Sequence, residues 1–246
     1  MTIHSAALVS AKAKVGDNVT IGAFTTIHDN VAIFGENSII ESYCEIGIPN
    51  ENSEGKVLVL GKDTHIRSHS IFYENSEFGD RLITGHRVTV REKTYTGINL
   101  QIGTLSDIQG HCKIGDHVRL HSNVHIGQKS VIGNYVWLFP YVVLTNDPHP
   151  PSNIVQGVTL EDYSVIATMS VILPGAIIAR GCVIGAGSIV GKDTEADMLY
   201  AGNPAKKICE TKRIRLKDGS RLPAYPWTKH FHRGYPEEIV KQWKGE

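Results

Sequence analysis

The chain has 246 residues, 25 basic against 25 acidic side chains and a pI near 7.2, so it offers no broad basic field for nucleic acid. No run approaches the roughly 18 consecutive apolar residues of a membrane span, and the first residues lack the pattern of a signal peptide, which predicts a cytoplasmic protein without membrane partners. The four cysteines include no CxxC pair, which predicts reduced thiols and neither a disulfide frame nor a zinc site.

From the N-terminus onward, anchor residues, most of them aliphatic, recur at every sixth position. The runs of these anchor residues cover 3–39, 60–144 and 160–190. A period of six fits neither the three-and-four spacing of a helix nor a single alternating strand, and a β-sandwich would not keep one phase for so long. We therefore expect short strands joined by corners, with three sides to a coil and the anchors in one axial core. The prediction is an all-β parallel β-helix of about nine coils over 1–196.

Glycine often follows an anchor, as at Gly103, which predicts corners with unusual backbone angles. Two breaks in phase, near 48–56 and at 145–159, are rich in turn-forming residues and predict inserted loops. Because loops on a rigid scaffold often carry function, the second loop is a candidate site. The repeat stops before a tail of 197–246, whose end from Pro236 to Lys244 is predicted to form a short amphipathic helix.

This repeat is similar to that of the hexapeptide-repeat acyltransferases, whose fold is a left-handed parallel β-helix. The resemblance implies the handedness, which runs against the usual right-handed crossover rule. It also implies a homotrimer with active sites between neighbouring chains and the second loop reaching over an adjacent chain.

The segment from Ala201 to Lys206 reads Ala-Gly-Asn-Pro-Ala-Lys. It matches at all six places the segment that follows the last coil in this family and helps to hold coenzyme A. The resemblance implies acetyl-CoA as co-substrate and no metal, with small residues lining the pantetheine channel and a lysine meeting the nucleotide phosphates. The expected cofactor-binding residues are Ala167, Ala186, Gly202, Asn203, Pro204 and Lys206.

The segment covering 112–150 resembles the nucleotide-linked amino-sugar N-acyltransferases, in its Cys-x-Ile-Gly, its repeat with an Asn and its Thr-Asn-Asp. The resemblance implies acetyl transfer to the amino group of a nucleotide-linked amino sugar, in cell-surface polysaccharide biosynthesis. A neutral amine needs mainly orientation, whereas a histidine near its ordinary pKa suits proton removal. The expected catalytic residues are His149, His121 and Asp147, and the expected substrate-binding residues are Asn123, His125 and Asn146.

Several alternatives remain open at this point. One is O-acetylation of a saccharide or antibiotic hydroxyl, with His149 as general base. Another follows from the N-terminal half, which looks like the lipid A pathway's UDP-sugar O-acyltransferases; their catalytic His segment aligns with 105–112, where Asp107 replaces the His. A zinc carbonic anhydrase-like site at His117, His121 and His125 has a spacing of four that suits a helix and not a six-residue coil. A scaffold without catalysis would fail to bind coenzyme A.

Overall fold

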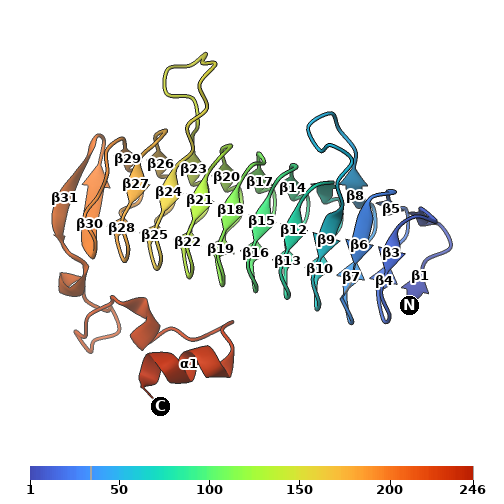
Figure 1. Cartoon of the computed structure of the whole chain (residues 1–246). Helices are drawn as coiled ribbons and strands as arrows, with labels where there is room; N and C mark the ends of the chain where they lie inside the picture. Colours follow the sequence, from blue (N-terminus) through green and yellow to red (C-terminus); the bar gives the residue numbers. More distant parts are fainter. Residues whose placement is uncertain (34, 246) are drawn as a thin grey trace.

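Two-residue strands alternate with tight corners along most of the chain, as a six-residue repeat requires. The computed structural model describes residues 1–33 and 35–245, and its strands stack into an elongated three-sided prism (Figure 1). Each strand pairs in parallel with the equivalent strand of the next coil, so the backbone hydrogen bonds run along the prism. The all-β parallel β-helix is therefore confirmed.

The three sides are called face A, face B and face C. Face A contains β1 (Thr2–Ile3), β4 (Thr20–Ile21), β7 (Ile39–Ile40), β10 (His65–Ile66), β13 (Ile83–Thr84), β16 (Gln101–Ile102), β19 (Arg119–Leu120), β22 (Trp137–Leu138), β25 (Val165–Ile166), β28 (Val183–Ile184) and β30 (Met198–Gly202), followed by the antiparallel β31 (Ala205–Glu210). Face B contains β2 (Leu8–Val9), β5 (Thr26–Ile27), β8 (Glu45–Ile48), β11 (Ile71–Tyr73), β14 (Thr89–Val90), β17 (Asp107–Ile108), β20 (His125–Ile126), β23 (Val143–Leu144), β26 (Val171–Ile172) and β29 (Ile189–Val190). Face C contains β3 (Lys14–Val15), β6 (Val31–Ile33), β9 (Leu58–Leu60), β12 (Glu77–Phe78), β15 (Tyr95–Thr96), β18 (Lys113–Ile114), β21 (Val131–Ile132), β24 (Thr159–Leu160) and β27 (Ile177–Ile178).

The stack has about eleven turns, so the predicted nine coils were too few. Two strands, each one side of a coil, were missed: Ile46 lies inward on β8, between the first two predicted runs of anchors, and β30 adds a strand beyond Val190. The phase also shifts by one position earlier than expected, because the next inward anchor, Ile40, lies seven positions after Ile33 instead of six. Ile40 is fully buried, whereas Ile39 is 40% exposed.

The core is a single column of aliphatic side chains inside the prism. Anchors of the middle coils, such as Ile66, Ile108 and Leu138, have no exposed surface. Burying each such side chain contributes about 1.5–3 kcal/mol, and the coils share one continuous core. Phe72 and Phe78 meet edge to face inside it, with ring centroids 5.3 Å apart.

The glycines after the anchors have a different role from the predicted one. The left-handed backbone angle falls on the second corner residue, such as Asn123 with φ 59°. Gly103 has no positive φ; a Cβ there would collide with the backbone of His121 and Ser122 on the next coil. Close approach of stacked corners, and not an unusual angle, therefore requires this glycine.

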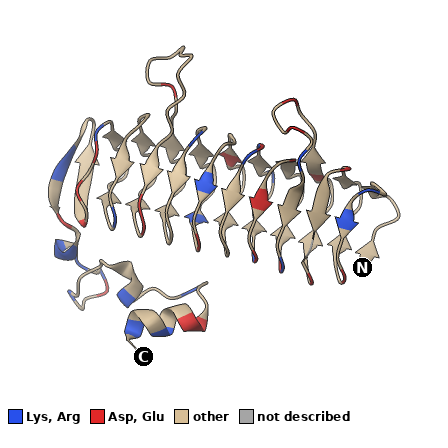
Figure 2. Cartoon of the chain, in the orientation of Figure 1, with Lys and Arg blue, Asp and Glu red and all other residues tan. Residues whose placement is uncertain are grey.

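Two loops project from the corner between faces B and C, after β8 and after β23 (Figure 1). Residues 211–245, called the C-terminal arm, leave the end of the prism and fold back beneath it. The arm contains η1 (Thr211–Arg213), η2 (Trp227–Lys229) and α1 (Glu237–Lys244), so the predicted terminal helix is present. Among the described residues no helix has both the length and the apolar character that crossing a membrane demands. Acidic and basic residues are interspersed along the ribbon of the prism (Figure 2).

The arm packs on face A through aromatic side chains. Trp227 and Tyr235 are buried against Trp137 and Val165. The Trp137 indole N–H donates to the Tyr235 hydroxyl at 2.8 Å. A groove remains between the arm and face A, and the candidate site lies there.

Candidate active site

The corner between faces A and B presents one column of residues, each directly after an inward anchor. The His121 N–H donates to the Leu138 carbonyl at 2.8 Å, and the Ala167 N–H donates to the Ile184 carbonyl at 2.9 Å. Because successive coils are in register, these residues lie one above another along the prism. In chain order the column contains Glu41, Arg67, Gly85, Gly103, His121, Phe139, Ala167, Gly185 and Ala201.

A groove of about 500 Å³ opens beside the middle of this column, between face A and the arm. Three arginines line it: Arg67, Arg119 and Arg233. Among the described residues, no aspartate or glutamate lines the groove, and none of the three arginines forms an ion pair with a carboxylate. A chain with balanced charge therefore holds a local surplus of guanidinium groups, which suits a ligand with phosphate groups.

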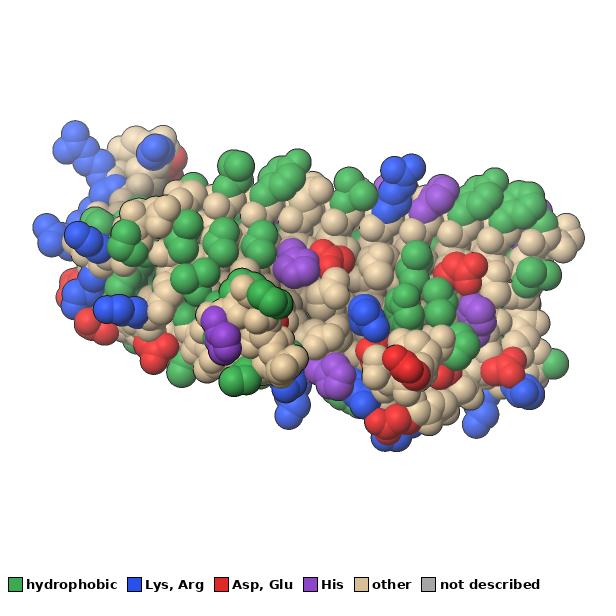
Figure 3. Space-filling model, turned by 90° about the horizontal axis from the view of Figure 1, so that it is seen from above, with side chains coloured by type: hydrophobic (Ala, Val, Ile, Leu, Met, Phe, Trp, Pro, Cys, Tyr) green, Lys and Arg blue, Asp and Glu red, His purple; other side chains and the backbone are tan. Residues whose placement is uncertain are grey.

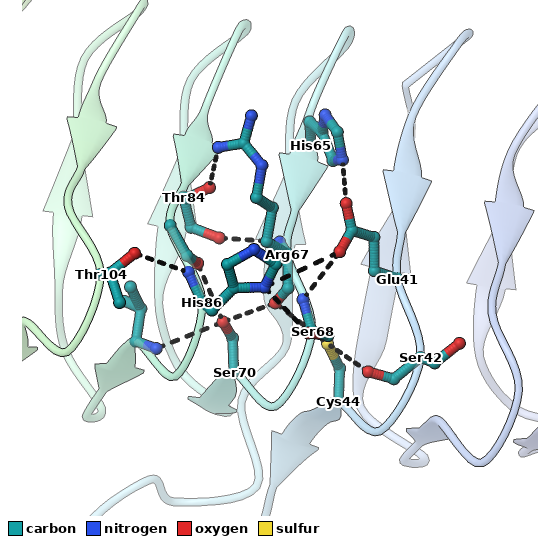
Figure 4. A network of polar contacts seen from close by, with 12 residues as sticks. Glu41, Ser42, Cys44, His65, Arg67, Ser68, Ser70, Thr84, His86 and Thr104 are labelled. Atoms are coloured by element: carbon teal, nitrogen blue, oxygen red, sulfur yellow. Dashed lines mark hydrogen bonds and ion pairs between the residues drawn. The ribbon is translucent and has the colours of Figure 1, made fainter.

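Two of the arginines are held by backbone carbonyls. Arg119 is 4% exposed, and its Nη2 donates to the Gly234 carbonyl of the arm at 2.7 Å. Burial lowers the pKa of Arg119, yet an arginine stays charged at neutral pH. Arg67 donates from Nη1 to the Thr84 carbonyl at 2.8 Å (Figure 4). Both charges are thereby fixed in position without being neutralised.

A polar network at the N-terminal end of the groove holds the carboxylate of Glu41 (Figure 4). Glu41 Oε1 lies 2.8 Å from His65 Nε2, and Glu41 Oε2 accepts from the Ser68 N–H at 3.1 Å. Burial by itself would raise the pKa of Glu41, but these hydrogen bonds outweigh it and lower that pKa. Ser68 Oγ lies 2.9 Å from His86 Nδ1. The glutamate charge is therefore taken up by His65 and the Ser68 amide.

His121 lies where the groove meets the column. The imidazole is half-buried and stacks on Phe139, with ring centroids 4.7 Å apart and planes at 14°. Burial lowers the pKa of His121, so the ring is neutral at physiological pH. Within the described chain its nitrogens form no side-chain hydrogen bond, and the ring lines the groove. The structure thus presents a fixed neutral imidazole that is able to accept a proton.

His125 lies four residues further on, around the corner on face B. Its Nδ1 lies 3.0 Å from both carboxylate oxygens of Asp107, and Gln109 also donates to that carboxylate. Burial would raise the pKa of Asp107, but the bonds from His125 and Gln109 outweigh it and lower that pKa. A second histidine–carboxylate pair lies near the same face: His28, directly after β5, is 3.0 Å from Glu45 of β8. We therefore interpret His125 and Asp107 as a surface pair, apart from the groove.

The remaining predicted catalytic and substrate-binding residues do not line the groove. Asn123 occupies the corner in a left-handed conformation. Asn146 lies at the base of the second loop, where its carbonyl accepts from the Gln156 N–H at 2.9 Å. Asp147 and His149 are exposed further out on that loop. In the single chain, the structure separates these residues from His121.

The expected cofactor-binding residues gather at the C-terminal end of the column. Gly202, Asn203 and Pro204 form the turn between β30 and β31, and the Gly202 N–H donates to Ser188 Oγ at 3.1 Å. Ala167 and Ala186 lie on the two coils just before this turn, and Lys206 is exposed on β31. Small residues therefore lead along the corner from the turn as far as Ala167, and Phe139 lies between Ala167 and His121.

The sequence analysis missed the three arginines and the aromatic arm. Arg67 directly follows the anchor Ile66 and Arg119 directly precedes the anchor Leu120, so the repeat could have placed both arginines on face A. Arg233 and Gly234 lie outside the repeat, so no periodicity places them over this face.

A prism of stacked hexapeptide coils defines the class of parallel β-helix repeat proteins. Comparison with solved structures gives the same fold: an Arabidopsis UDP-N-acetylglucosamine acyltransferase has a TM-score of 0.73 at 21% identity, covering 85% of this chain and 74% of that one. The UDP-N-acetylglucosamine acyltransferase of Campylobacter jejuni has a TM-score of 0.58 at 18% identity, covering 99% of this chain and 82% of that one. The chain therefore shares the parallel β-helix fold of these solved structures, and its six-residue repeat is similar to that of the hexapeptide-repeat acyltransferases.

The sequence relatives include several enzymes of one name. The acyl-[acyl-carrier-protein]–UDP-N-acetylglucosamine O-acyltransferase of Saccharophagus degradans is 32% identical over 145 residues, covering 54% of this chain and 48% of that protein. The enzyme of the same name from Pseudomonas savastanoi pv. phaseolicola is 26% identical over 147 residues, covering 60% of this chain and 49% of that protein. The chain thus spans about half the length of the curated relatives it matches. No protein-family model matches the chain.

These relatives agree with the predicted class of acyltransferase but contradict the predicted reaction. Their names specify transfer to oxygen from acyl carrier protein, so the predictions of N-acetyl transfer and of acetyl-CoA as donor were wrong. The lipid A type of O-acyltransferase, ranked lower because Asp107 replaces a histidine, is the one the comparisons favour. The error arose because the Thr-Asn-Asp loop and the Ala-Gly-Asn-Pro-Ala-Lys turn do not distinguish an amine from a hydroxyl acceptor, or one thioester carrier from another.

Proposed function

We propose that the protein is an O-acyltransferase that moves an acyl group from an acyl carrier protein thioester to a hydroxyl of UDP-N-acetylglucosamine or a closely related nucleotide sugar. The observation that carries the proposal is the neutral, half-buried His121 where the arginine-lined groove meets the column. The relatives' donor and acceptor support the same reaction.

In this proposal the acceptor enters from the groove. Its diphosphate is bound by Arg67, Arg119 and Arg233, since guanidinium groups bind phosphate oxygens through paired hydrogen bonds. The sugar then lies toward His121, where one hydroxyl donates a hydrogen bond to the free imidazole nitrogen. This arrangement uses binding energy from the nucleotide to orient the reacting oxygen.

The donor approaches along the other half of the column. The pantetheine arm of the carrier protein lies over Ala167, Ala186 and Gly202, where larger side chains would obstruct it. His121 accepts the hydroxyl proton as the oxygen attacks the thioester carbonyl, so a C–O bond forms and the C–S bond breaks. The imidazolium then returns the proton to the departing thiolate, and His121 is neutral again.

The proposal includes the homotrimer that the family resemblance implies. Apolar side chains that are more than half exposed follow the corner between faces A and B, and apolar groups are spread along the length of the surface shown in Figure 3. These corner residues are Phe24, Tyr43, Leu105, Tyr141 and Met169. An exposed apolar ridge of this kind favours self-association. A neighbouring chain on this ridge would border the column and complete the site.

A transfer assay tests the proposed function. The purified protein is incubated with acyl carrier proteins bearing acyl chains of several lengths and with UDP-N-acetylglucosamine, and products are read by mass spectrometry. We expect an acylated nucleotide sugar whose ester bond is cleaved by hydroxylamine. A hydroxylamine-resistant amide product, or transfer from acetyl-CoA but not from the carrier protein, would contradict the proposal.

A further inference from the structure

An aromatic pocket adjoins the arginine-lined groove and has no role in the proposed proton transfer. It has a volume of about 220 Å³ and lies between face A and the arm. Six of its eight lining residues carry rings: Trp137, Phe139, Tyr225, Trp227, His230 and Phe231, with Val165 and Ala224 completing the wall. Trp137 and Phe231 also line the groove, so the pocket and the groove share a boundary.

We propose that this pocket binds the nucleobase of the acceptor nucleotide while the groove binds its phosphates. The inference rests on the proposed function and names the nucleotide subsite within it. Aromatic side chains are suitable partners for a planar base, since each base presents a flat face for stacking. The adjoining arginines, which lack carboxylate partners among the described residues, supply charge complementarity for the phosphates of the same ligand.

Polar groups in the pocket wall favour a base over an acyl chain. Trp227 is 8% exposed, and in the described structure its indole N–H is buried without a hydrogen-bond partner. A buried donor of this kind is costly unless a ligand or water pairs with it, and a base carbonyl is able to accept from it. The Nε2 atom of His230 lies 2.8 Å from the Ala224 carbonyl oxygen, and this contact fixes the imidazole ring in the pocket wall.

The pocket exists only because the arm covers face A. Trp137 belongs to β22, whereas Tyr225, Trp227 and Phe231 belong to the arm. The Trp137 ring meets the Phe231 ring edge to face at 5.5 Å and the Trp227 ring at 6.0 Å. A base seated here would therefore contact both the prism and the arm.

Tryptophan fluorescence tests the inference without any acyl donor, because all three tryptophans of the chain lie in this aromatic cluster. Uridine monophosphate and N-acetylglucosamine 1-phosphate are titrated into the full chain. We expect uridine monophosphate to quench the emission and to bind about tenfold to a hundredfold more tightly, because stacking of the base contributes to its binding alone. Equal affinity of the two ligands would overturn the inference.

Two variants locate the binding. Phe231→Leu should lower the affinity for uridine monophosphate about tenfold and leave the affinity for N-acetylglucosamine 1-phosphate unchanged. Arg233→Met should lower the affinity for both ligands. The matched control is Tyr95→Leu, at an exposed position of β15 on face C, which should change neither. Competition between uridine monophosphate and an acylated pantetheine lacking a nucleotide would assign the pocket to the acyl chain and overturn the inference.

Failure of this inference and failure of the proposed function give different results. Base-dependent binding without any acyl transfer would leave the nucleotide subsite standing and remove the proposed reaction. Acyl transfer to UDP-N-acetylglucosamine without any binding preference for the base would support the proposed reaction and remove the nucleobase subsite.

Discussion

His121→Asn tests the assignment of the general base. The asparagine keeps a polar side chain in the groove but is a very weak base. Loss of a positioned general base costs about 10²- to 10⁴-fold in rate, which is about 2.7–5.4 kcal/mol at about 1.36 kcal/mol for each factor of ten. Because the arginines that bind the nucleotide are untouched, we expect the loss in kcat, with KM for the nucleotide sugar changing less than about threefold.

The folded state should tolerate this change. His121 stacks on Phe139 but has no side-chain hydrogen bond within the described residues, so the variant loses about 0.5–1.5 kcal/mol of ring packing. Urea denaturation would measure this cost, and steady-state transfer from acyl carrier protein would measure kcat and KM. The matched control is His125→Asn, four residues away on face B, which should keep at least a third of the wild-type kcat. Full activity in His121→Asn together with a large loss in His125→Asn would refute the assignment and make the pair with Asp107 the catalytic unit.

Three further predictions concern the prism. Glu92 is buried, and its carboxylate accepts a hydrogen bond from Asn50 Nδ2 at 2.9 Å. Burial would raise the pKa of Glu92, but hydrogen bonds from its own backbone N–H, Asn50 and Arg91 outweigh burial and lower that pKa. The ionised Glu92 stabilises the fold above its unfolded pKa of about 4.3, and this contribution is lost as the pH falls through the lower folded pKa. The free energy of unfolding in urea should therefore decrease more steeply with acidification for wild type than for Glu92→Gln. Equal pH dependence of the two free energies would contradict this. Burial raises the pKa of Cys112 to about 12, and it also raises the pKa values of the buried thiols Cys44 and Cys182. A thiol reagent should therefore label only the half-buried Cys209 in the folded chain. Labelling of more than one thiol before unfolding would contradict a closed core. Phe72→Ala should cost about 3–5 kcal/mol in urea denaturation, since the side chain is fully buried, and a cost under 1 kcal/mol would contradict the axial core.

Most of the prism could be predicted because burial repeats along the chain with the coil. An aliphatic side chain at every sixth position has one solution, an axial core, and residues such as Ile108 and Leu138 lie there. The errors arose where the period changes. The phase shift before Ile40 comes from one additional residue, and Ile46 was hidden beside an inserted loop.

The candidate site was harder to predict because it depends on contacts outside the repeat. His121 was a candidate from its position beside an anchor, but its groove forms only where the arm returns to face A. Arg119 meets the Gly234 carbonyl 115 residues away in the chain, and no pattern in the sequence specifies that contact. The choice between amine and hydroxyl acceptors was wrong for a related reason: it depends on the geometry of the bound ligand, which the loop motif around Asn146 does not encode.

A crystal structure of the protein with UDP-N-acetylglucosamine bound tests the central claim most directly. The account predicts the diphosphate among Arg67, Arg119 and Arg233, with one sugar hydroxyl about 3 Å from an imidazole nitrogen of His121. A sugar placed on face B beside His125, or a groove that stays empty at saturating ligand, would contradict it.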